Sequence, residues 1–156
     1  MSAQRYWLMK SEPDCYSIDD LQREKKTFWD GVRNYQVRNF MRDDMKPGDL
    51  AFFYHSSTEP PGIVGVMTIT KSGYPDHTQF DPDEDHFDPK SSPDNPRWLM
   101  VDVKFVSKFK EMIPLSELKE TPGLEKMVVT QRGSRLSVQP VTEEEWKTVM
   151  SLSNGE

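Results

Sequence analysis

The stretch from Trp98 to Phe109 (WLMVDVKFVSKF) constrains the fold most strongly, because apolar and polar side chains alternate along it. Alternation with a period of two predicts a long amphipathic β-strand with one face buried. A strand of this kind is stable only when it pairs with other strands and packs against a core. The chain is therefore expected to build a sheet that is covered on at least one face.

Further elements follow from the same kinds of pattern. Short apolar runs predict strands at Tyr6–Met9, Leu50–His55 and Ile63–Thr70, and a final short strand at Leu136–Val138. Helical spacing and capping residues predict helices that begin near Ser17, Tyr35, Pro114 and Thr142. About five strands and four helices in this order indicate the α+β class, with a mixed, mostly antiparallel sheet or open barrel.

Length and composition suit one domain, which we expect to span residues 1–156. The hydrophobic fraction is only 35%, but aromatic residues make up 11% of the chain and each buries a large area. No stretch approaches the ~18 apolar residues of a membrane span, and the N-terminus lacks the apolar segment of a signal peptide. The single cysteine, Cys15, fits a reducing compartment, so we expect a cytoplasmic protein.

The net charge of −6 lies in one segment, because residues 76–95 carry seven acids and one base while the rest of the chain is neutral. A protein that grips duplex phosphates broadly carries a basic surplus, so the composition argues against bulk electrostatic binding of DNA. It leaves open a site that recognises one small group. The acidic segment is also rich in proline, and we expect an irregular loop that runs over the surface.

Two clusters of polar and aromatic residues follow expected elements. Residues 10–13 (KSEP) come directly after the first strand and form either an ordinary exposed ion pair or a site in which a partly buried Lys10 has a lowered pKa. In residues 29–34 (WDGVRN), Trp29 either offers a stacking face or fills the core. Asn34 either caps a helix or reads a base edge, and Arg33 suits a carboxylate or phosphate.

The third cluster is residues 53–56 (FYHS), at the end of a strand. Alternation places Tyr54 on the face opposite Phe53 and His55. Neighbouring residues of a strand point apart, which makes a nucleophilic pair of His55 and Ser56 geometrically poor and argues against a hydrolytic triad. A further basic turn at residues 131–135 contains Arg132, which either contacts a phosphate or lies in a solvated hairpin.

Neither a metal nor a nucleotide cofactor is expected. Residues 81–85 (DPDED) imitate a calcium-binding loop, but His86 and Ser92 stand where an EF-hand needs glycine and glutamate. His77 and His86 have no cysteine nearby, which argues against structural zinc. The two common phosphate-binding motifs, GxGxxG and GxxxxGK[ST], do not occur in the sequence.

Five ordered motifs together resemble the EVE domain family. They are residues 7–13 (WLMKSEP), 29–34 (WDGVRN), 52–56 (FFYHS), 74–76 (YPD) and 135–140 (RLSVQP). The resemblance extends from Tyr6 to about Leu152. It implies a PUA-like fold, an open β-barrel of about five to six mostly antiparallel strands flanked by helices.

The resemblance also implies a reader of modified nucleobases, chiefly modified cytosines. Carried over by motif, the ligand-binding residues are Lys10, Ser11, Glu12, Trp29, Arg33, Asn34, Tyr54, His55, Ser56, Tyr74 and Arg132. Trp29 or Tyr54 is expected to stack on the base while polar side chains read its edge, as a flipped base requires. The expected partner is nucleic acid that carries modified bases, or a free modified nucleoside, bound by a monomer without catalysis.

Two other functions stay open. PUA-like folds include ASCH proteins that resemble amidohydrolases acting on acylated cytidines through Lys, Thr and Glu, and Lys10, Ser11 and Glu12 supply similar groups although no motif places a threonine. A protein-interaction module that uses the acidic loop is the other alternative. The chain begins almost at its first strand, whereas animal members of the family carry a basic extension, which suggests a bacterial, cytoplasmic protein.

Overall fold

The computed structural model describes residues 5–14, 16–29, 34–84, 87–94, 96–131 and 136–153. Its frame is a six-stranded sheet in the order β2-β5-β4-β3-β1-β6. The strands are β1 (Tyr6–Ser11), β2 (Lys26–Trp29), β3 (Leu50–His55), β4 (Gly62–Pro75), β5 (Leu99–Pro114) and β6 (Val138–Val141). β1 and β3 are parallel, and the other neighbours are antiparallel.

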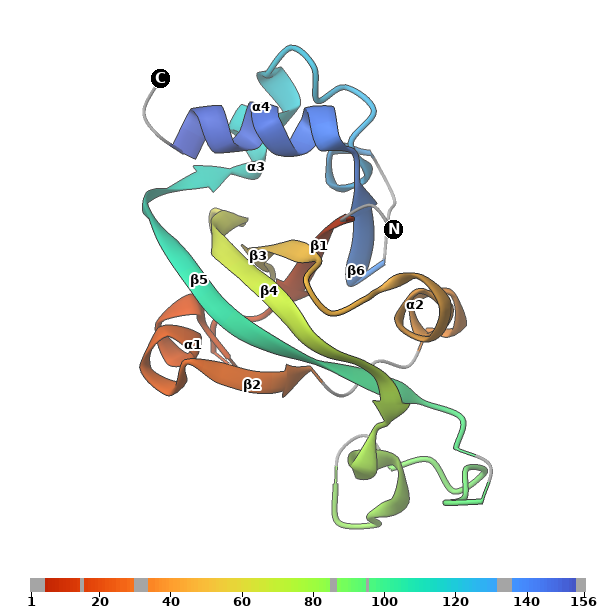
Figure 1. Ribbon diagram of the computed structural model, residues 1–156. Helices are drawn as coiled ribbons and strands as arrows, with labels where there is room; N and C mark the ends of the chain where they lie inside the picture. Colours follow the sequence, from red (N-terminus) through yellow and green to blue (C-terminus); the bar gives the residue numbers. More distant parts are fainter. Residues whose placement is uncertain are drawn as a thin grey trace.

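Helices cover the sheet on two sides (Figure 1). They are α1 (Ile18–Glu24), α2 (Tyr35–Asn39), α3 (Leu115–Glu120) and α4 (Glu143–Ser153), with a π-helical turn at Phe40–Asp44 and 3-10 turns at His77–Phe80 and Val128–Thr130. α3 and α4 lie together at the top of Figure 1, and α1 and α2 lie below. The expected α+β class, with an open and mostly antiparallel sheet flanked by helices, is confirmed.

Two elements differ from the expectation. No strand was expected between the first two helices, but Lys26–Trp29 forms the edge strand β2, which pairs with β5. Its four residues are too few for a clear period, so the pairing with β5 decides the structure. The helix expected to begin near Tyr35 is α-helical only to Asn39 and continues as the π-helical turn.

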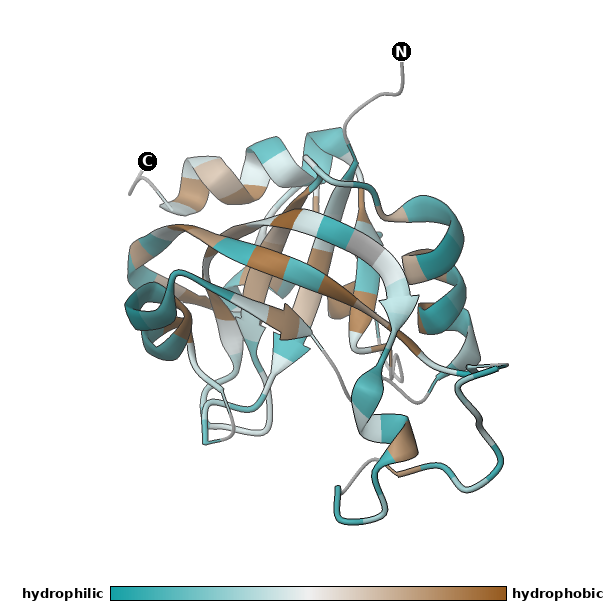
Figure 2. Cartoon of the chain, turned by 60° about the horizontal axis from the view of Figure 1, so that its bottom comes forward, coloured by the Kyte–Doolittle hydropathy of each residue, from teal (hydrophilic) through white to brown (hydrophobic). Residues whose placement is uncertain are grey.

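The sheet separates two groups of core residues, because successive side chains of a strand point to opposite faces. On β3, Phe53 packs with α1 and α2, whereas Phe52 and Tyr54 pack with α3 and α4. Figure 2 shows the hydrophobic residues concentrated in the strands and the hydrophilic ones on the outer helices and the loop at the bottom. In the described ranges no helix is long and apolar enough to cross a membrane.

The acidic segment differs from the expectation of a loop that runs only over the surface. Its first part is buried, and Gln79 lies at the centre of a hydrogen-bond network. The Gln79 amide nitrogen donates to the carbonyl oxygens of Asp76 and Trp98, both at 2.7 Å. Its carbonyl oxygen accepts from the backbone N–H groups of Arg97 and Trp98. Because these contacts satisfy the buried polar atoms, the start of the loop packs against the sheet instead of lying in solvent.

Candidate functional site

The ends of β1 and β3 bring two of the sequence motifs together. These strands run parallel in register, so Lys10 lies opposite Tyr54 and Ser11 opposite His55. The pairing continues one residue further, where the N–H of Ser56 donates to the carbonyl oxygen of Ser11 at 3.0 Å. Parallel strands end at the same edge of a sheet, and the polar residues that follow them therefore form one rim.

Lys10 and Tyr54 occupy one side of this rim. The Lys10 ammonium group lies 5.8 Å from the centre of the Tyr54 ring. Burial lowers the pKa of Lys10 and raises the pKa of Tyr54 to about 12. Only 3% of Tyr54 is exposed, so its ring has no open face for a base. The expectation that Tyr54 stacks on a ligand is therefore corrected: alternation along β3 turns this side chain into the core beneath α4.

Aromatic rings gather on the opposite side of the sheet around Phe53. The Trp29 ring meets Phe53 edge to face at 5.5 Å, and His55 does so at 5.6 Å. Tyr16 stacks on the same ring at 6.5 Å. Trp29 is 8% exposed and belongs to the hydrophobic core. Trp29 and Tyr54 thus face different sides of the sheet, so the two rings expected as alternatives for stacking do not share one site.

The polar groups on the Phe53 side hold the turn that leads into α1. The Ser11 hydroxyl donates to the carbonyl oxygen of Tyr16 at 2.7 Å. The Nε2 atom of His55 accepts from the N–H of Ile18, the first residue of α1, at 3.1 Å. As neighbours in a strand, Ser11 and Lys10 point to opposite faces. The Lys–hydroxyl–Glu arrangement of the hydrolase alternative is therefore not assembled by these residues.

Burial lowers the pKa of His55 from its ordinary value of 6.5. In the unfolded chain this side chain takes up a proton at a higher pH than in the folded protein, so stability contributed by neutral His55 is present above pH 6.5 and is lost as the pH falls towards the folded pKa. Protonation also removes the Nε2 acceptor for Ile18. We expect the free energy of unfolding to decrease between neutral and mildly acidic pH, and His55→Gln to weaken that decrease.

Denaturant unfolding at several pH values checks this prediction. His77→Gln is the matched control, because it removes a histidine that is exposed. The control should keep the wild-type dependence of unfolding free energy on pH. Equal pH dependence in wild type and His55→Gln would contradict the proposed role of His55.

Asn34 sits at the start of α2 and is exposed. Its Oδ1 atom caps the helix by accepting from the N–H of Val37 at 3.0 Å. The amide nitrogen of Asn34 forms no hydrogen bond with a residue in the described ranges. Both interpretations of this residue are therefore compatible, because the oxygen caps the helix while the two N–H donors remain available to a ligand.

The remaining expected site residues lie elsewhere. Arg33 and Arg132 fall outside the described residues. Tyr74 lies near the far end of β4, where its hydroxyl donates to Asp102 and its ring lies 4.1 Å from the Lys71 ammonium group. Among the described residues, no contact given by the structure joins Tyr74 or Asn34 to the ends of β1 and β3.

Two features of the site were not singled out from the sequence. Phe53 is its structural centre, and the alternation of β3 places this residue on the same side as His55. Tyr16 packs against Phe53, and burial together with a hydrogen bond to Glu24 raises the pKa of Tyr16 to about 12. Within the described ranges, no three His, Cys, Asp or Glu side chains gather closely enough to hold a metal ion.

An open six-stranded sheet with polar residues at the paired ends of β1 and β3 agrees with one known class of domain. The model of the EVE domain family matches residues 5–152, so the chain belongs to this family, whose fold is PUA-like. The chain is 50% identical to human thymocyte nuclear protein 1 over an alignment that is 169 residues long and covers 97% of the chain and 75% of the human protein.

Solved structures agree with this assignment. The human thymocyte nuclear protein 1 structure, described as a complex with DNA that contains 5-methylcytosine, is 49% identical with a TM-score of 0.91, covering 98% of this chain and 99% of that one. A protein from Pseudomonas syringae is 51% identical with a TM-score of 0.91, covering 95% of this chain and 99% of the other. The expected EVE membership and PUA-like fold are confirmed.

Proposed function

We propose that this protein binds nucleic acid that carries a modified cytosine and holds the modified base without chemical change. One observation carries the proposal: the chain resembles, over nearly its whole length, the human protein whose structure is described as a complex with 5-methylcytosine DNA. The composition is compatible with such a site, because recognition of one flipped base needs an aromatic surface and a few polar groups rather than a strongly basic face.

The proposed base site lies on the Phe53 side of the sheet. Trp29 and His55 both contact Phe53, so the end of β2 and the rim at the ends of β1 and β3 meet at one aromatic group. In this proposal the rim supplies Ser11, Glu12, His55 and Ser56 to the base, and Trp29, Arg33 and Asn34 complete the site. Lys10, which lies on the Tyr54 side of the rim, contacts flanking nucleotides together with Tyr74 and Arg132. Tyr54 contributes by supporting Lys10 from the core rather than by stacking.

The proposal is tested by titrating fluorescent oligonucleotides that differ only in one base, cytosine or 5-methylcytosine, with DNA and RNA versions of each. We expect tighter binding of the modified oligonucleotide and no change in its nucleosides after incubation. Equal affinity for modified and unmodified forms in both polymers would contradict the proposal. Turnover of acylated cytidines would favour the amidohydrolase alternative instead.

Asn34→Ser separates base reading from helix capping. Serine caps a helix about as well as asparagine but lacks the amide donors, so we expect stability to change little and the preference for the modified base to decrease. Asn34→Ala should lose the same preference and, in addition, about 0.5–2 kcal/mol of stability, because the cap is lost. Affinity ratios and denaturant unfolding of both variants check this prediction. A preference unchanged in Asn34→Ser would restrict Asn34 to capping.

The finer expectations about the partner and the location stay predictions. Relatives occur in animals and in bacteria, so a bacterial origin does not follow from similarity. A cytoplasmic location, a monomeric state and binding of a free modified nucleoside likewise remain predictions. The oligonucleotide titration includes the free nucleoside 5-methyldeoxycytidine as a competitor, which separates recognition of the base alone from recognition of the polymer.

A further inference from the structure

The outer face of β2, β5 and β4 carries two unneutralised lysines side by side. Lys26 on β2 lies directly opposite Lys104 on β5, which lies opposite Thr68 on β4. Both lysines are exposed, and neither forms an ion pair with a residue that the structure describes. Like charges directly opposite each other destabilise an antiparallel pair. Repulsion between the two lysines therefore destabilises the free protein, and a bound anion would relieve that repulsion.

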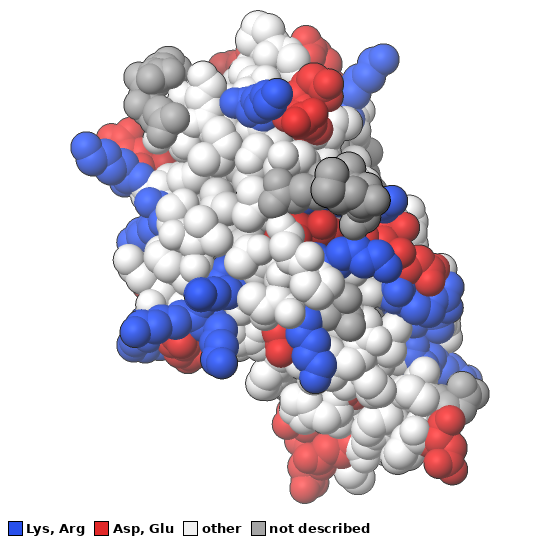
Figure 3. Space-filling view, in the orientation of Figure 1, with Lys and Arg blue, Asp and Glu red and all other residues white. Residues whose placement is uncertain are grey.

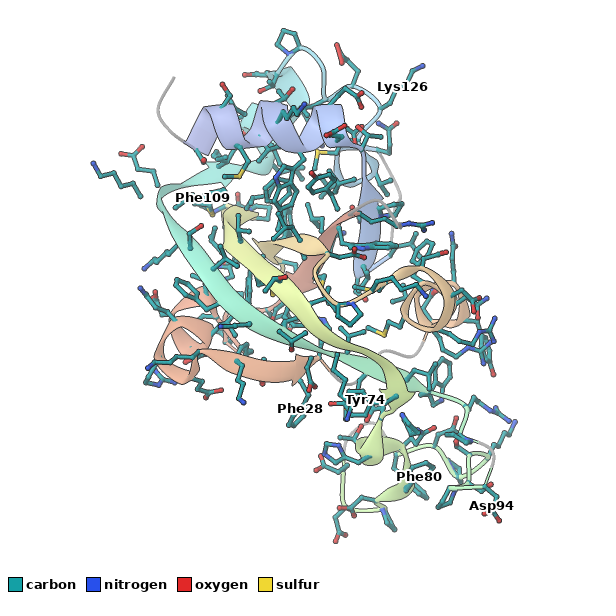
Figure 4. All side chains as sticks on the ribbon, in the orientation of Figure 1. Phe28, Tyr74, Phe80, Asp94, Phe109 and Lys126 are labelled. Atoms are coloured by element: carbon teal, nitrogen blue, oxygen red, sulfur yellow. The ribbon has the colours of Figure 1, made fainter. Side chains whose placement is uncertain are left out.

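An exposed aromatic ring accompanies the lysines. Phe28 follows Lys26 by two residues on the same face of β2, and 43% of it is exposed. Its ring meets that of His77 at 77° with centroids 5.1 Å apart, which fixes its orientation. Figure 4 shows Phe28 pointing away from the sheet, with Tyr74 nearby. An ordered ring that remains exposed offers a surface for stacking.

One more lysine and one acid complete this face. Lys71 on β4 is exposed and lies opposite Asp102 on β5. The Asp102 carboxylate accepts the hydroxyl of Tyr74. We call Lys26, Phe28, Lys71 and Lys104 the lysine face. Figure 3 shows lysine and arginine side chains gathered at the lower left, over α1, β2 and the adjoining part of β5, and acidic side chains on the loop at the bottom.

The lysine face is joined to the proposed base site through β2. Phe28 and Trp29 are neighbours in this strand, so Phe28 points outward while Trp29 points towards Phe53. In the proposed complex, one base reaches the Trp29 side and its neighbouring nucleotides run along the outside of β2, where Phe28 lies. Exposed lysines suit phosphate groups, and an exposed aromatic ring suits an unpaired base.

We propose that the lysine face binds the nucleotides that flank the recognised base, with Lys26 and Lys104 on backbone phosphates and Phe28 stacked on an unpaired base. This inference rests on the proposed function, because it assigns the path of the same nucleic acid. It reconciles binding of a polyanion with the net charge of −6, since the excess of acids over bases lies in the separate loop of residues 76–95 and not on the lysine face.

The test compares two double variants of the full chain that change the net charge equally. Lys26→Gln with Lys104→Gln removes the lysine pair, whereas Lys119→Gln with Lys126→Gln removes two exposed lysines in and after α3, towards the other end of the molecule (Figure 4). Binding of a 5-methylcytosine oligonucleotide is measured over a series of salt concentrations. For the first variant we expect about tenfold weaker binding, and a salt dependence of log Kd shallower by about 1.4–1.8, the value for two lost phosphate contacts.

The control variant should bind almost as wild type, and both variants should keep the preference for the modified base, because phosphate contacts carry no base information. Phe28→Leu should weaken binding about fivefold or more through the lost stack. Thermal unfolding of the Lys26/Lys104 variant should match or exceed that of wild type, since a like-charge pair is removed. A melting temperature at or above that of wild type shows that weaker binding by this variant does not reflect misfolding.

The possible outcomes separate the two proposals. If wild type prefers the modified oligonucleotide but the Lys26/Lys104 variant binds and responds to salt like the control, the lysine face is overturned and the proposed function stands. If the two double variants weaken binding equally, only general charge acts and the lysine face is likewise overturned. If wild type binds no oligonucleotide at any salt concentration, both proposals are overturned.

Discussion

Trp29→Ala is expected to lower the free energy of unfolding by about 3–5 kcal/mol, the usual effect of removing a large aromatic side chain from a core. Trp29 is 8% exposed, and its ring packs edge-on against Phe53. The cavity would open between β2 and β3, which are not neighbours in the sheet. Trp29→Phe should retain part of the contact and lose roughly 1–3 kcal/mol. Denaturant unfolding of the three proteins measures these differences.

The neighbouring residue supplies the control for this experiment. Phe28→Ala removes an aromatic ring from the same strand, but the ring lies on the outer face and is partly exposed, so a loss of about 1 kcal/mol or less is expected. A variant Trp29→Ala that unfolds like wild type but no longer binds the modified oligonucleotide would contradict the core assignment. It would show instead that Trp29 serves mainly as a ligand-facing ring.

Asp49→Ala is expected to have an effect of similar size, about 3–5 kcal/mol of unfolding free energy. The buried Asp49 carboxylate accepts from the Trp7 indole N–H at 3.0 Å, from the N–H of Arg5 at 3.1 Å and from the N–H of Lys46 at 3.0 Å. Alanine leaves the buried Trp7 donor and two partly buried backbone donors without their acceptor. Hydrogen bonds to a charged group contribute about 1.5–3 kcal/mol each. Loss of these hydrogen bonds removes the link between the start of β1 and the turn that precedes β3.

Two further variants serve as comparisons for Asp49→Ala. Asp49→Asn keeps one carbonyl oxygen as an acceptor, so it should lose less than Asp49→Ala. Asp44→Ala removes a nearby acid that is partly exposed and pairs with Arg5 at 3.2 Å, and such a pair contributes about 0–1 kcal/mol. Denaturant unfolding ranks the three variants. If Asp49→Ala were no more destabilising than Asp44→Ala, the buried hydrogen bonds would not support the fold as described.

Alternation and helix capping predicted most of the elements, because these signals act within a few residues. The pattern of residues 98–109 and the apolar run of residues 50–55 correspond to β5 and β3, and Thr142 forms the predicted capping box with Glu145. β2 was not predicted, because four residues give no clear period and its pairing partner β5 lies more than seventy residues away along the chain.

The arrangement of the site was predictable only in part. Alternation along β3 correctly separated Tyr54 from Phe53 and His55. The contact between Trp29 and Phe53 joins strands that are not neighbours in the sheet, and no local pattern encodes it. The buried start of the acidic loop has the same explanation, because it depends on hydrogen bonds between Gln79 and Trp98, which lie 19 residues apart in the chain.

The central claim is that a modified cytosine binds at the rim formed by the ends of β1 and β3, on the side of the sheet where Trp29 packs against the buried Phe53. It is tested most directly by NMR. The chemical shifts of the backbone amides and of the tryptophan indole N–H groups of the full chain are followed during titration with an oligonucleotide that contains one 5-methylcytosine. We expect the largest shifts at Ser11, Glu12, Asn34 and Ser56 and at the Trp29 indole, with smaller shifts for the unmodified oligonucleotide. Shifts confined to α4 or the acidic loop, or equal shifts for both oligonucleotides, would contradict the claim.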